Sequence, residues 1–234
     1  MKMIKTPTFS RRGFLISSGS AGVAFSFLAA CSPNGTSAGD ASADTDGPYE
    51  PVKWFTIDEE GIVTVNIIRA EMGQHVGTSL ARILAEELEA DWQNVRINHV
   101  DSDPKWGLMV TGGSWSVWQT FPLYSQAGAA GRTALIEAAA ASMGVAASDC
   151  QARKGEVICG DKKMSFGEIV AGGIERTFTD EELAAIELKP ASERRKLGRP
   201  IKARDVRGKT NGEAVFGIDA KFEGMVYARP VMPP

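Results

Sequence analysis

The sequence contains few of the residues from which most catalytic and metal-binding centres are built. Only two histidines and three cysteines occur among its 234 residues, and the cysteines are scattered. Because metal centres need several such ligands at short spacings, the cysteines do not predict one. His99 lies in a stretch that alternates apolar and polar residues like a strand with one face in solvent. A site built on His75 and His99 is therefore also disfavoured.

Several well-known sequence signatures are missing as well. The glycine-rich phosphate motifs GxxxxGK followed by Ser or Thr, and GxGxxG, do not occur. Ser114 lacks the GxSxG context of a serine hydrolase nucleophile. The chain has no long basic run after its first dozen residues, its formal net charge is −3, and its pI is about 5.6. This balance argues against nucleic acid as a partner.

Residues 1–31 have the pattern of an export signal and are not expected to belong to the fold. A basic start is followed by residues 13–30, which are apolar, small and uncharged. SRRGFL, at residues 10–15, has the twin-arginine pattern that directs export of an already folded protein. LAAC resembles a bacterial lipobox, which makes Cys31 the predicted lipidation site. We therefore expect a periplasmic, lipid-anchored protein; an ordinary cleavage site and a transmembrane anchor are the alternatives.

The rest of the chain divides by composition into three parts. Residues 32–50 are rich in Ser, Gly, Asp and Ala and predict a disordered tether. Residues 51–198 predict a mixed α+β domain, and residues 199–234 a connection and the start of a further domain. The elements expected in the central part are strands at 53–58, 62–68 and 92–100 and helices at 78–89, 127–143, 165–171 and 180–188. A helix between two strands predicts a crossover and a layered arrangement.

A hairpin is predicted around Lys154 and Gly155. With a two-residue turn, Cys150 and Cys159 would face each other across the strands, and a disulfide would be geometrically allowed. With a three-residue turn the cysteines would fall out of register, and folding in the reducing cytoplasm would also disfavour the bond. The sequence leaves both arrangements open.

The C-terminal part contains a charged stretch and an alternating one. KPASERRKLGRP, residues 189–200, is flanked by prolines and predicts a solvated connection. GEAVFGIDAKFEGMVYAR, residues 212–229, alternates like strands of a new sheet. Because the chain offers these strands no partner, residues 205–234 are expected to open a further domain whose continuation lies outside this chain.

Two short segments combine glycine with hydrogen-bonding side chains. We name them the first loop, EMGQHVGT at residues 71–78, and the second loop, TGGSWSVW at residues 111–118. Their glycines permit close approach of the backbone, Gln74 can donate and accept, and Thr78 is expected at a helix N-terminus that attracts anions. Neither loop contains Lys or Arg, so a phosphate would be held by amides and hydroxyls. Each loop taken alone is equally compatible with an ordinary capped turn.

The order and spacing of the two loops carry a family resemblance. AEMGQHVGTSLARILAEEL followed by TGGSWSV resembles the molybdopterin-binding large subunit of the xanthine dehydrogenase/aldehyde oxidase family. It looks closest to the isoquinoline 1-oxidoreductase beta-subunit type, whose members begin with a twin-arginine signal. GKTNGEAVFGIDAKFEGMVYAR, residues 208–229, resembles the start of that family's hammerhead domain. The resemblance covers most of residues 51–234.

The resemblance implies a molybdenum hydroxylase, which inserts water-derived oxygen at an aldehyde or an electron-poor heterocyclic carbon. Its cofactor would be a molybdopterin cytosine dinucleotide, and a small 2Fe–2S subunit would take the electrons away. Carried over residue by residue, the cofactor-binding positions are Gly73, Gln74, Thr111, Gly113, Ser114 and Ser116.

The sequence departs from the family pattern at two points. His75 stands where the family usually has glycine. No residue matches the family's catalytic glutamate, which lies far toward the C-terminus of a longer chain, and Glu71 is not a substitute for it. We therefore expect an N-terminal portion that contributes cofactor loops but no catalytic residue and no metal ligand.

Two other interpretations stay open. The chain could be a non-catalytic periplasmic lipoprotein that keeps the fold as a binding or assembly module. A solute-binding lipoprotein would also explain the tether, but it leaves the pairing of the two loops without a reason.

Overall fold

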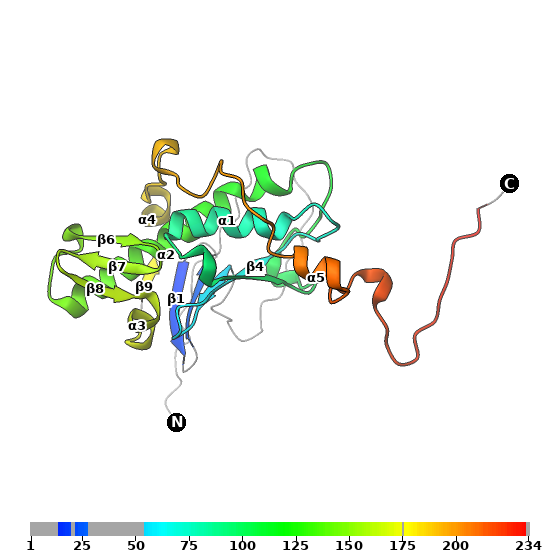
Figure 1. Cartoon of the computed structure of the whole chain (residues 1–234), viewed down its shortest axis with the longest axis horizontal. Helices are drawn as coiled ribbons and strands as arrows, with labels where there is room; N and C mark the ends of the chain where they lie inside the picture. The colour runs from blue at the N-terminus through cyan, green and yellow to red at the C-terminus, as the bar shows by residue number, and fades with distance from the viewer. Residues whose placement is uncertain (1–13, 20–21, 28–53, 175, 233–234) are drawn as a thin grey trace, which may run out of the picture.

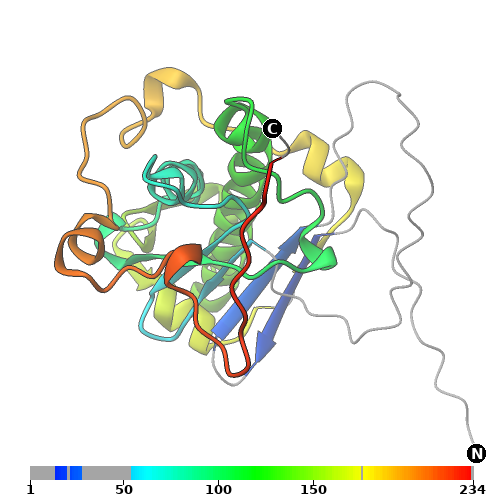
Figure 2. The same cartoon turned by 90° about the vertical axis from the view of Figure 1, so that its right-hand side faces the viewer.

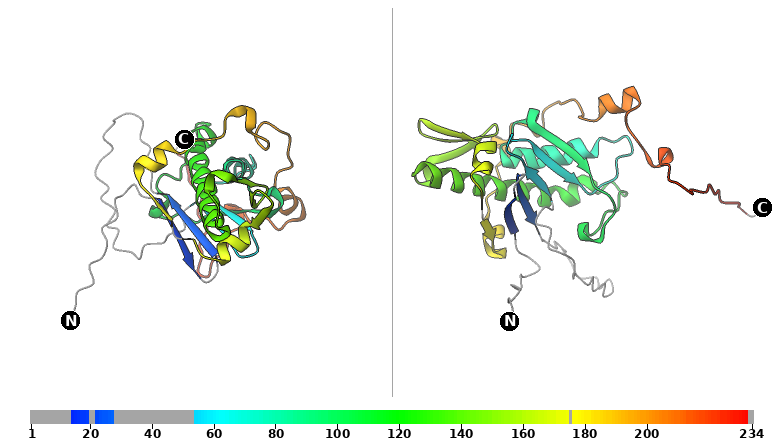
Figure 3. Two further views of the ribbon diagram at one scale, coloured as in Figure 1. Left: turned by 90° about the vertical axis from the view of Figure 1, so that its left-hand side faces the viewer. Right: turned by 90° about the horizontal axis from the view of Figure 1, so that it is seen from below.

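The computed structural model describes residues 14–19, 22–27, 54–174 and 176–232. Helices α1 (Val76–Leu88) and α2 (Ser116–Met143) pack side by side over a six-stranded sheet, and a three-stranded sheet lies at one end (Figures 1 and 2). The C-terminal residues run away from this body (Figure 3). The expected mixture of helices and sheet is confirmed.

The larger sheet has the strand order β5-β4-β3-β2-β1-β9. Its strands are β1 (Phe14–Gly19), β2 (Gly22–Phe27), β3 (Phe55–Ile57), β4 (Val63–Ile67), β5 (Val95–His99) and β9 (Arg176–Phe178). β4 and β5 are parallel and joined through α1, which confirms the predicted crossover. The C-terminal ends of these two strands therefore meet at one edge of the sheet, just before the first loop.

Helices α1 and α2 approach closely because small residues lie between them. A Cβ atom on Gly128 would come within 2.5 Å of the carbonyl oxygen of Leu84, so no larger residue fits there. On the facing side, Leu80, Leu84 and Leu88 are fully buried at the spacing of one helical face. α2 begins at Ser116, whereas the alanine-rich pattern predicted a start at residue 127.

The smaller sheet consists of β6 (Cys150–Arg153), β7 (Glu156–Cys159) and β8 (Lys162–Ser165). Lys154 and Gly155 have φ angles of 50° and 80° and form the two-residue turn between β6 and β7. Cys150 consequently lies opposite Cys159, and the two are joined by a disulfide. Of the two arrangements that the sequence leaves open, the structure has the in-register one.

Two short helices begin with capping boxes. Ser165 caps α3 (Phe166–Ala171) and Thr179 caps α4 (Asp180–Ala185), each paired with a glutamate three residues later. The remaining short elements are α5 (Val206–Asn211) and the 3-10 turns η1 (Trp92–Asn94), η2 (Pro104–Trp106), η3 (Ala147–Asp149), η4 (Ala191–Glu193) and η5 (Gly217–Asp219). Among the described residues, no helix is both long and apolar enough to cross a membrane.

Strands β1 and β2 come from the stretch that the sequence predicts to be an export signal. They form a hairpin in which β2 pairs with β3 and β1 pairs with β9. In the unprocessed chain this stretch therefore joins two parts of the sheet. Export and cleavage stay predictions, because the twin arginines, Cys31 and the tether at residues 32–50 lie outside the described residues.

Residues 189–209 form a strap that runs along α1 (Figure 1). At its start, the fully buried carboxylate of Glu86 on α1 accepts hydrogen bonds from Lys189 Nζ at 2.7 Å and from the amides of Arg195, Lys196 and Leu197. The prediction of a solvated connection therefore holds for most side chains of residues 191–200 but not for Lys189 or the amides of residues 195–197, because a buried carboxylate requires such donors.

The C-terminal stretch contains no strand within the described residues 199–232. Its apolar side chains face solvent, and Ile218, for example, is 93% exposed. The strands predicted at residues 212–229 are therefore not formed here. An alternating segment needs a neighbouring strand to complete its backbone hydrogen bonds, and none lies beside it among the described residues.

The buried anion predicts a pH-dependent stability. Burial acts to raise the pKa of Glu86, but the hydrogen bonds from Lys189 and the three amides lower it from 4.5 to about 2. This carboxylate therefore stabilises the fold fully above pH 4.5, and its contribution is lost as the pH falls toward 2. Glu86→Gln should lower the free energy of unfolding by about 3 kcal/mol near pH 7, measured by urea denaturation.

The matched control is Glu181→Gln, which changes an exposed glutamate on α4 and should shift stability by less than about 0.5 kcal/mol. The deficit of Glu86→Gln should shrink between pH 4.5 and 2. A deficit that stays constant over this range would contradict the account.

A second prediction concerns β1 and β2. A chain that begins at Cys31 should lose amide-exchange protection in β3 and β9, because these strands lose the partners that flank them. The hairpin of β6 and β7 serves as the internal control, since its pairing is independent of β1 and β2. Unchanged protection in β3 and β9 would mean that residues 14–27 are not part of the folded sheet.

Candidate functional site

The first loop is closed by its own side chains. The Oε1 atom of Glu71 accepts hydrogen bonds from the amides of Gly73 at 2.8 Å and His75 at 3.1 Å. The side chain of Gln74 spans the same turn: Met72 N donates to its Oε1 at 2.7 Å, and its Nε2 donates to Ala70 O at 2.9 Å. Gln74 therefore shapes the loop, and both polar atoms of its amide are engaged with the backbone.

His75 has a left-handed backbone conformation, which glycine adopts more easily than any other residue. It is the N-cap of α1 and has φ 59° and ψ 34°, in the left-handed region, where a non-glycine residue costs about 1–2 kcal/mol. Its Nδ1 lies 2.8 Å from Oδ1 of Asp205, at the end of the strap. A histidine at this position is thus less favourable for the backbone than glycine, but it provides a contact with the strap. Its imidazole does not cap α1.

The second loop starts the longer helix in a similar way. Gly113 and Ser114 have φ angles of 56° and 58°, and Trp115 then forms the N-cap of α2 without a side-chain hydrogen bond. The last three residues of each loop form the first turn of the helix that follows it. Both helices therefore begin with backbone amides that no capping side chain satisfies, which is the feature that attracts anions.

A buried arginine holds the two loops together. Arg69 is 3% exposed at the end of β4. Its guanidinium donates to the carbonyl oxygens of Leu108 at 2.8 Å and Val110 at 2.7 Å, and to Oε1 of Gln119 at 2.8 Å. The next residue, Ala70, donates its amide to Oγ1 of Thr111 at 2.8 Å. The two loops, predicted to act together, consequently lie side by side.

The predicted site residues have different situations within this arrangement. Gly73 and Gln74 lie exposed on the first loop, and Gly113 and Ser114 lie exposed on the second. Thr111 bridges the loops, and Ser116 is the first residue of α2. Thr78 lies in the first turn of α1, at the helix N-terminus where the sequence predicts it, but its side chain is buried and its Oγ1 accepts the amide of Arg204 at 3.0 Å.

The residues of both loops fit a large polar or anionic group. A Cβ atom on Gly73, Gly112 or Gly113 would meet nothing within 4 Å, so the backbone of both loops is open to approach. The indole nitrogen of Trp115 is buried and has no hydrogen-bond partner. An orphaned donor beside uncapped amides and three hydroxyls matches a ligand held by hydrogen bonds rather than by cations.

A compact charged cluster borders the first loop. We name it the latch: Glu71, His75, Asp205 and Lys209. Lys209 Nζ lies 2.7 Å from Glu71 Oε1, forms an ion pair with Asp205 and lies 3.4 Å from His75 Nδ1. The two carboxylates and the imidazole have a spacing that suits a metal ion. The ammonium of Lys209 already lies among them, so the chain supplies its own cation.

The latch shifts the pKa values of its members in the directions expected for paired charges. Burial acts to raise the pKa of Glu71, but hydrogen bonds from Lys209 and the loop amides hold it below its usual value. Burial likewise opposes the lowered pKa of Asp205, which follows from hydrogen bonds to Lys209 and His75. Burial acts to lower the pKa of Lys209, and the two carboxylates raise it. All three groups therefore stay charged over a wider pH range.

His99 does not extend this cluster. It is exposed at the end of β5, as its strand pattern predicts, and its imidazole lies over the first turn of α1. A Cβ atom on Gly77 would come within 2.7 Å of His99 Nε2, so this turn packs directly on the imidazole. His99 therefore packs on the helix start, while His75 contacts the strap.

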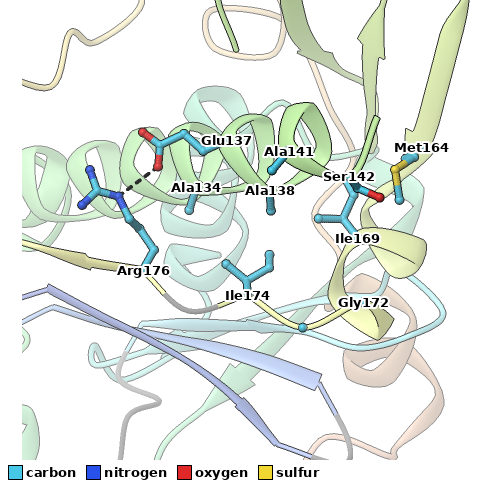
Figure 4. A pocket seen from close by; sticks show the side chains of 11 residues that line it. Ala134, Glu137, Ala138, Ala141, Ser142, Met164, Ile169, Gly172, Ile174 and Arg176 are labelled. Atoms are coloured by element: carbon cyan, nitrogen blue, oxygen red, sulfur yellow. Dashed lines mark hydrogen bonds and ion pairs between the residues drawn. The ribbon is translucent and has the colours of Figure 1, made fainter. Parts of the chain in front are cut away.

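Two hollows of the described structure lie near or apart from the loops. One, of about 700 Å³, lies between the ends of β4 and β5 and the strap, and the latch residues Glu71, Asp205 and Lys209 line it. The other, of about 390 Å³, is an apolar groove between α2 and α3, closed at one end by the ion pair of Arg176 and Glu137 (Figure 4). Its first wall residue, Ala134, lies about 27 Å along α2 from Ser116, so this groove is separate from the two loops.

Sequence reasoning did not identify Arg69, Asp205 or Lys209 as part of the site. Arg69 gave one signal, because a charged residue that directly follows a buried apolar strand must have a specific partner. Asp205 and Lys209 gave none, since more than a hundred residues separate them from the first loop and only the path of the strap brings them there.

Comparisons with known proteins identify the family of the chain. A family model described as a molybdopterin cofactor-binding domain matches residues 5–217. The chain is 56% identical over 229 residues to the membrane-bound aldehyde dehydrogenase (pyrroloquinoline-quinone) of Gluconacetobacter polyoxogenes, a match that covers 97% of this chain and 30% of that protein.

Two further relatives are named as subunits. The beta subunit of isoquinoline 1-oxidoreductase from Brevundimonas diminuta is 30% identical over 266 residues, covering 96% of this chain and 33% of that protein. A nicotinate dehydrogenase subunit of Pseudomonas putida is 26% identical over 184 residues, covering 77% of this chain and 15% of that protein. The chain thus spans a third or less of the length of these relatives. The match to most of the chain shows that it belongs to the molybdopterin-binding large subunits of the xanthine dehydrogenase family.

Proposed function

We propose that this chain is the N-terminal part of a periplasmic molybdenum hydroxylase large subunit and that its two loops hold part of a molybdopterin cytosine dinucleotide. The observation that carries this proposal is the set of hydrogen bonds from Arg69 to Leu108, Val110 and Gln119, which we name the clamp. The clamp brings two uncapped helix starts and an unpaired indole nitrogen together. Family membership alone would place the cofactor in the domain; the hydrogen bonds of Arg69 support these two loops as the proposed site.

The loop residues have distinct tasks in this proposal. The amides of Gly113 and Ser114 donate hydrogen bonds to phosphate oxygens, a role supported by their consecutive positive φ angles, since turns of this kind can form anion-binding concavities. The hydroxyl of Thr111 accepts from Ala70, so its own hydrogen remains available to donate to the ligand. Gln74 keeps the first loop in shape. When bound, the molybdenum cofactor would supply the oxygen-transfer and two-electron chemistry.

The substrate class follows from the relatives as a proposal. An aldehyde is favoured, because the 56% identical relative is named an aldehyde dehydrogenase, with an N-heterocycle as the second candidate. A small 2Fe–2S subunit is the proposed electron acceptor, supported by relatives that are named as subunits. Twin-arginine export fits such a protein, because a cofactor inserted in the cytoplasm must travel with a folded chain. Cys31 is the proposed lipid attachment site.

One relative favours a second cofactor. The name of the aldehyde dehydrogenase contains pyrroloquinoline quinone, whereas the matched family model is described by molybdopterin. We favour molybdopterin, because the loops offer amides and hydroxyls without a lysine or arginine. A tricarboxylate quinone is more readily held by cationic side chains or a metal ion.

The cofactor assignment predicts the composition of the purified protein. The exported protein, carrying any sequence that follows residue 234 in its gene, should contain molybdenum and release an equal amount of cytidine monophosphate on acid hydrolysis. Metal analysis and nucleotide chromatography measure the two. Extraction of pyrroloquinoline quinone from a molybdenum-free protein would refute the proposal.

A loop variant tests where the cofactor lies. Gly113→Val places a branched side chain at the open, left-handed position of the second loop and should lower the molybdenum content about tenfold. Gly160→Val is the matched control, because Gly160 also has a positive φ and open surroundings but follows β7 in the smaller sheet. Equal losses in both variants would contradict a role of the second loop.

The non-catalytic lipoprotein module remains the alternative, and the gene itself separates the two. A large subunit should continue in frame past Pro234 for about twice the length of this chain, given that the match covers about a third of its relatives. A stop codon directly after Pro234 would favour the stand-alone module.

A further inference from the structure

The end of the strap reaches the first loop through the latch. Arg204 donates its amide to Thr78 in the first turn of α1, and Asp205 then contacts His75. Lys209, on α5, completes the path by donating to Glu71. The strap therefore binds α1 at both ends, through Glu86 near its C-terminus and through the latch at its N-terminus.

Glu71 poses an electrostatic problem for an anion-binding loop. Its side chain is only 11% exposed, and its Oε1 lies beside the amides of Gly73 and His75. A buried carboxylate there repels a second anion and competes for the same donors. Both loops lack Lys and Arg, and the guanidinium of Arg69 is engaged with carbonyl oxygens and Gln119.

Lys209 is placed to compensate this charge. Its side chain is 16% exposed, and its ammonium contacts carboxylate oxygens of both Glu71 and Asp205. Without it, two carboxylates would stand unopposed beside the first loop. Because Lys209 lies at the end of the strap, on α5, the compensation reaches the loop only when the strap is docked along α1.

We propose that Lys209 is a positioning residue for the anionic cofactor, because its ammonium cancels the charge of Glu71 and pins the first loop to the strap. This inference rests on the proposed function. It adds that Asp205 and Lys209 link the end of the strap to the first loop, so that docking of the strap and retention of the cofactor are coupled.

The test compares four proteins with the wild type. Lys209→Met removes the ammonium, and Lys209→Arg keeps the charge. Lys202→Met is the matched control, since it removes an exposed lysine of the same strap. The double variant Lys209→Met with Glu71→Gln removes the ammonium together with the carboxylate that it cancels, and so restores the net charge of the latch without the tether.

Two readouts separate the pin from the charge. Amide exchange of residues 72–76 should be about tenfold faster in Lys209→Met and in the double variant, while Lys209→Arg and Lys202→Met match the wild type. Loss of molybdenum during incubation should be about three- to tenfold faster in Lys209→Met alone, because only this variant leaves Glu71 charged and without its ammonium partner. Thermal midpoints measured alongside should stay close to that of the wild type.

The outcomes are distinguishable. If amide exchange in Lys209→Met equals that in Lys202→Met, Lys209 does not hold the first loop to the strap. If molybdenum is lost equally fast from Lys209→Met and from the double variant, Lys209 does not act by compensating charge. A uniform increase in exchange across α1 and α2 would show a merely structural role and also overturn the proposal. A wild-type protein without molybdenum refutes the proposed function and the cofactor role together, and the exchange comparison still decides whether Lys209 pins the loop.

Discussion

The guanidinium of Arg69 is buried at the end of β4, and three acceptors from the region of the second loop surround it. The Nε of Arg69 has no hydrogen-bond partner among the described residues, so the terminal nitrogens of this buried cation depend on the carbonyl oxygens of Leu108 and Val110, which must stay where they are. That requirement fixes the start of the second loop relative to the end of β4. The parallel pairing of β4 with β5 and the crossover through α1 then place the first loop beside it. The candidate site is thus a consequence of one buried charge and one crossover.

The strap adds a second constraint, because buried or largely buried charged groups bind it to both ends of α1. At one end, Glu86 is enclosed by Lys189 and three consecutive amides. At the other, the latch joins the strap to the first loop. Helix α1 itself has no acidic residue in its first turn, no basic residue in its last turn, and no side-chain cap. Its ends are stabilised by a segment distant in sequence, which makes the geometry of the first loop depend on that segment.

Much of the fold follows from local patterns, and the errors arise where the decisive partner is remote. Alternation predicted β4 and β5, helical spacing predicted α1, and the helices expected at residues 165–171 and 180–188 correspond to α3 and α4. The charges of residues 189–200 indicated solvent exposure, because the pattern contains no sign of the buried Glu86 that binds their amides. The early start of α2 escaped prediction for a related reason. Residues 116–126 carry a proline and no alanine, and tertiary packing rather than propensity makes them helical.

The loops themselves show the same division. Their glycines, hydroxyls and missing cations could be recognised from sequence, and their order carried the family resemblance. The functions of Gln74 and His75 could not be recognised, because they depend on hydrogen bonds with Ala70, Met72 and Asp205 that only the folded backbone creates. Gln74, predicted to bind the cofactor, also holds its own loop together. His75, which stands where the family usually has glycine, contacts Asp205 of the strap.

The central claim is that the two loops form one cradle for one ligand. The most direct measurement is a density map of the molybdenum-loaded large subunit, from crystals or by cryo-electron microscopy. The account predicts phosphate oxygens within hydrogen-bonding distance of amides in both loops, with the clamp of Arg69 intact. A cofactor that contacts neither loop, or only one of them, would contradict it.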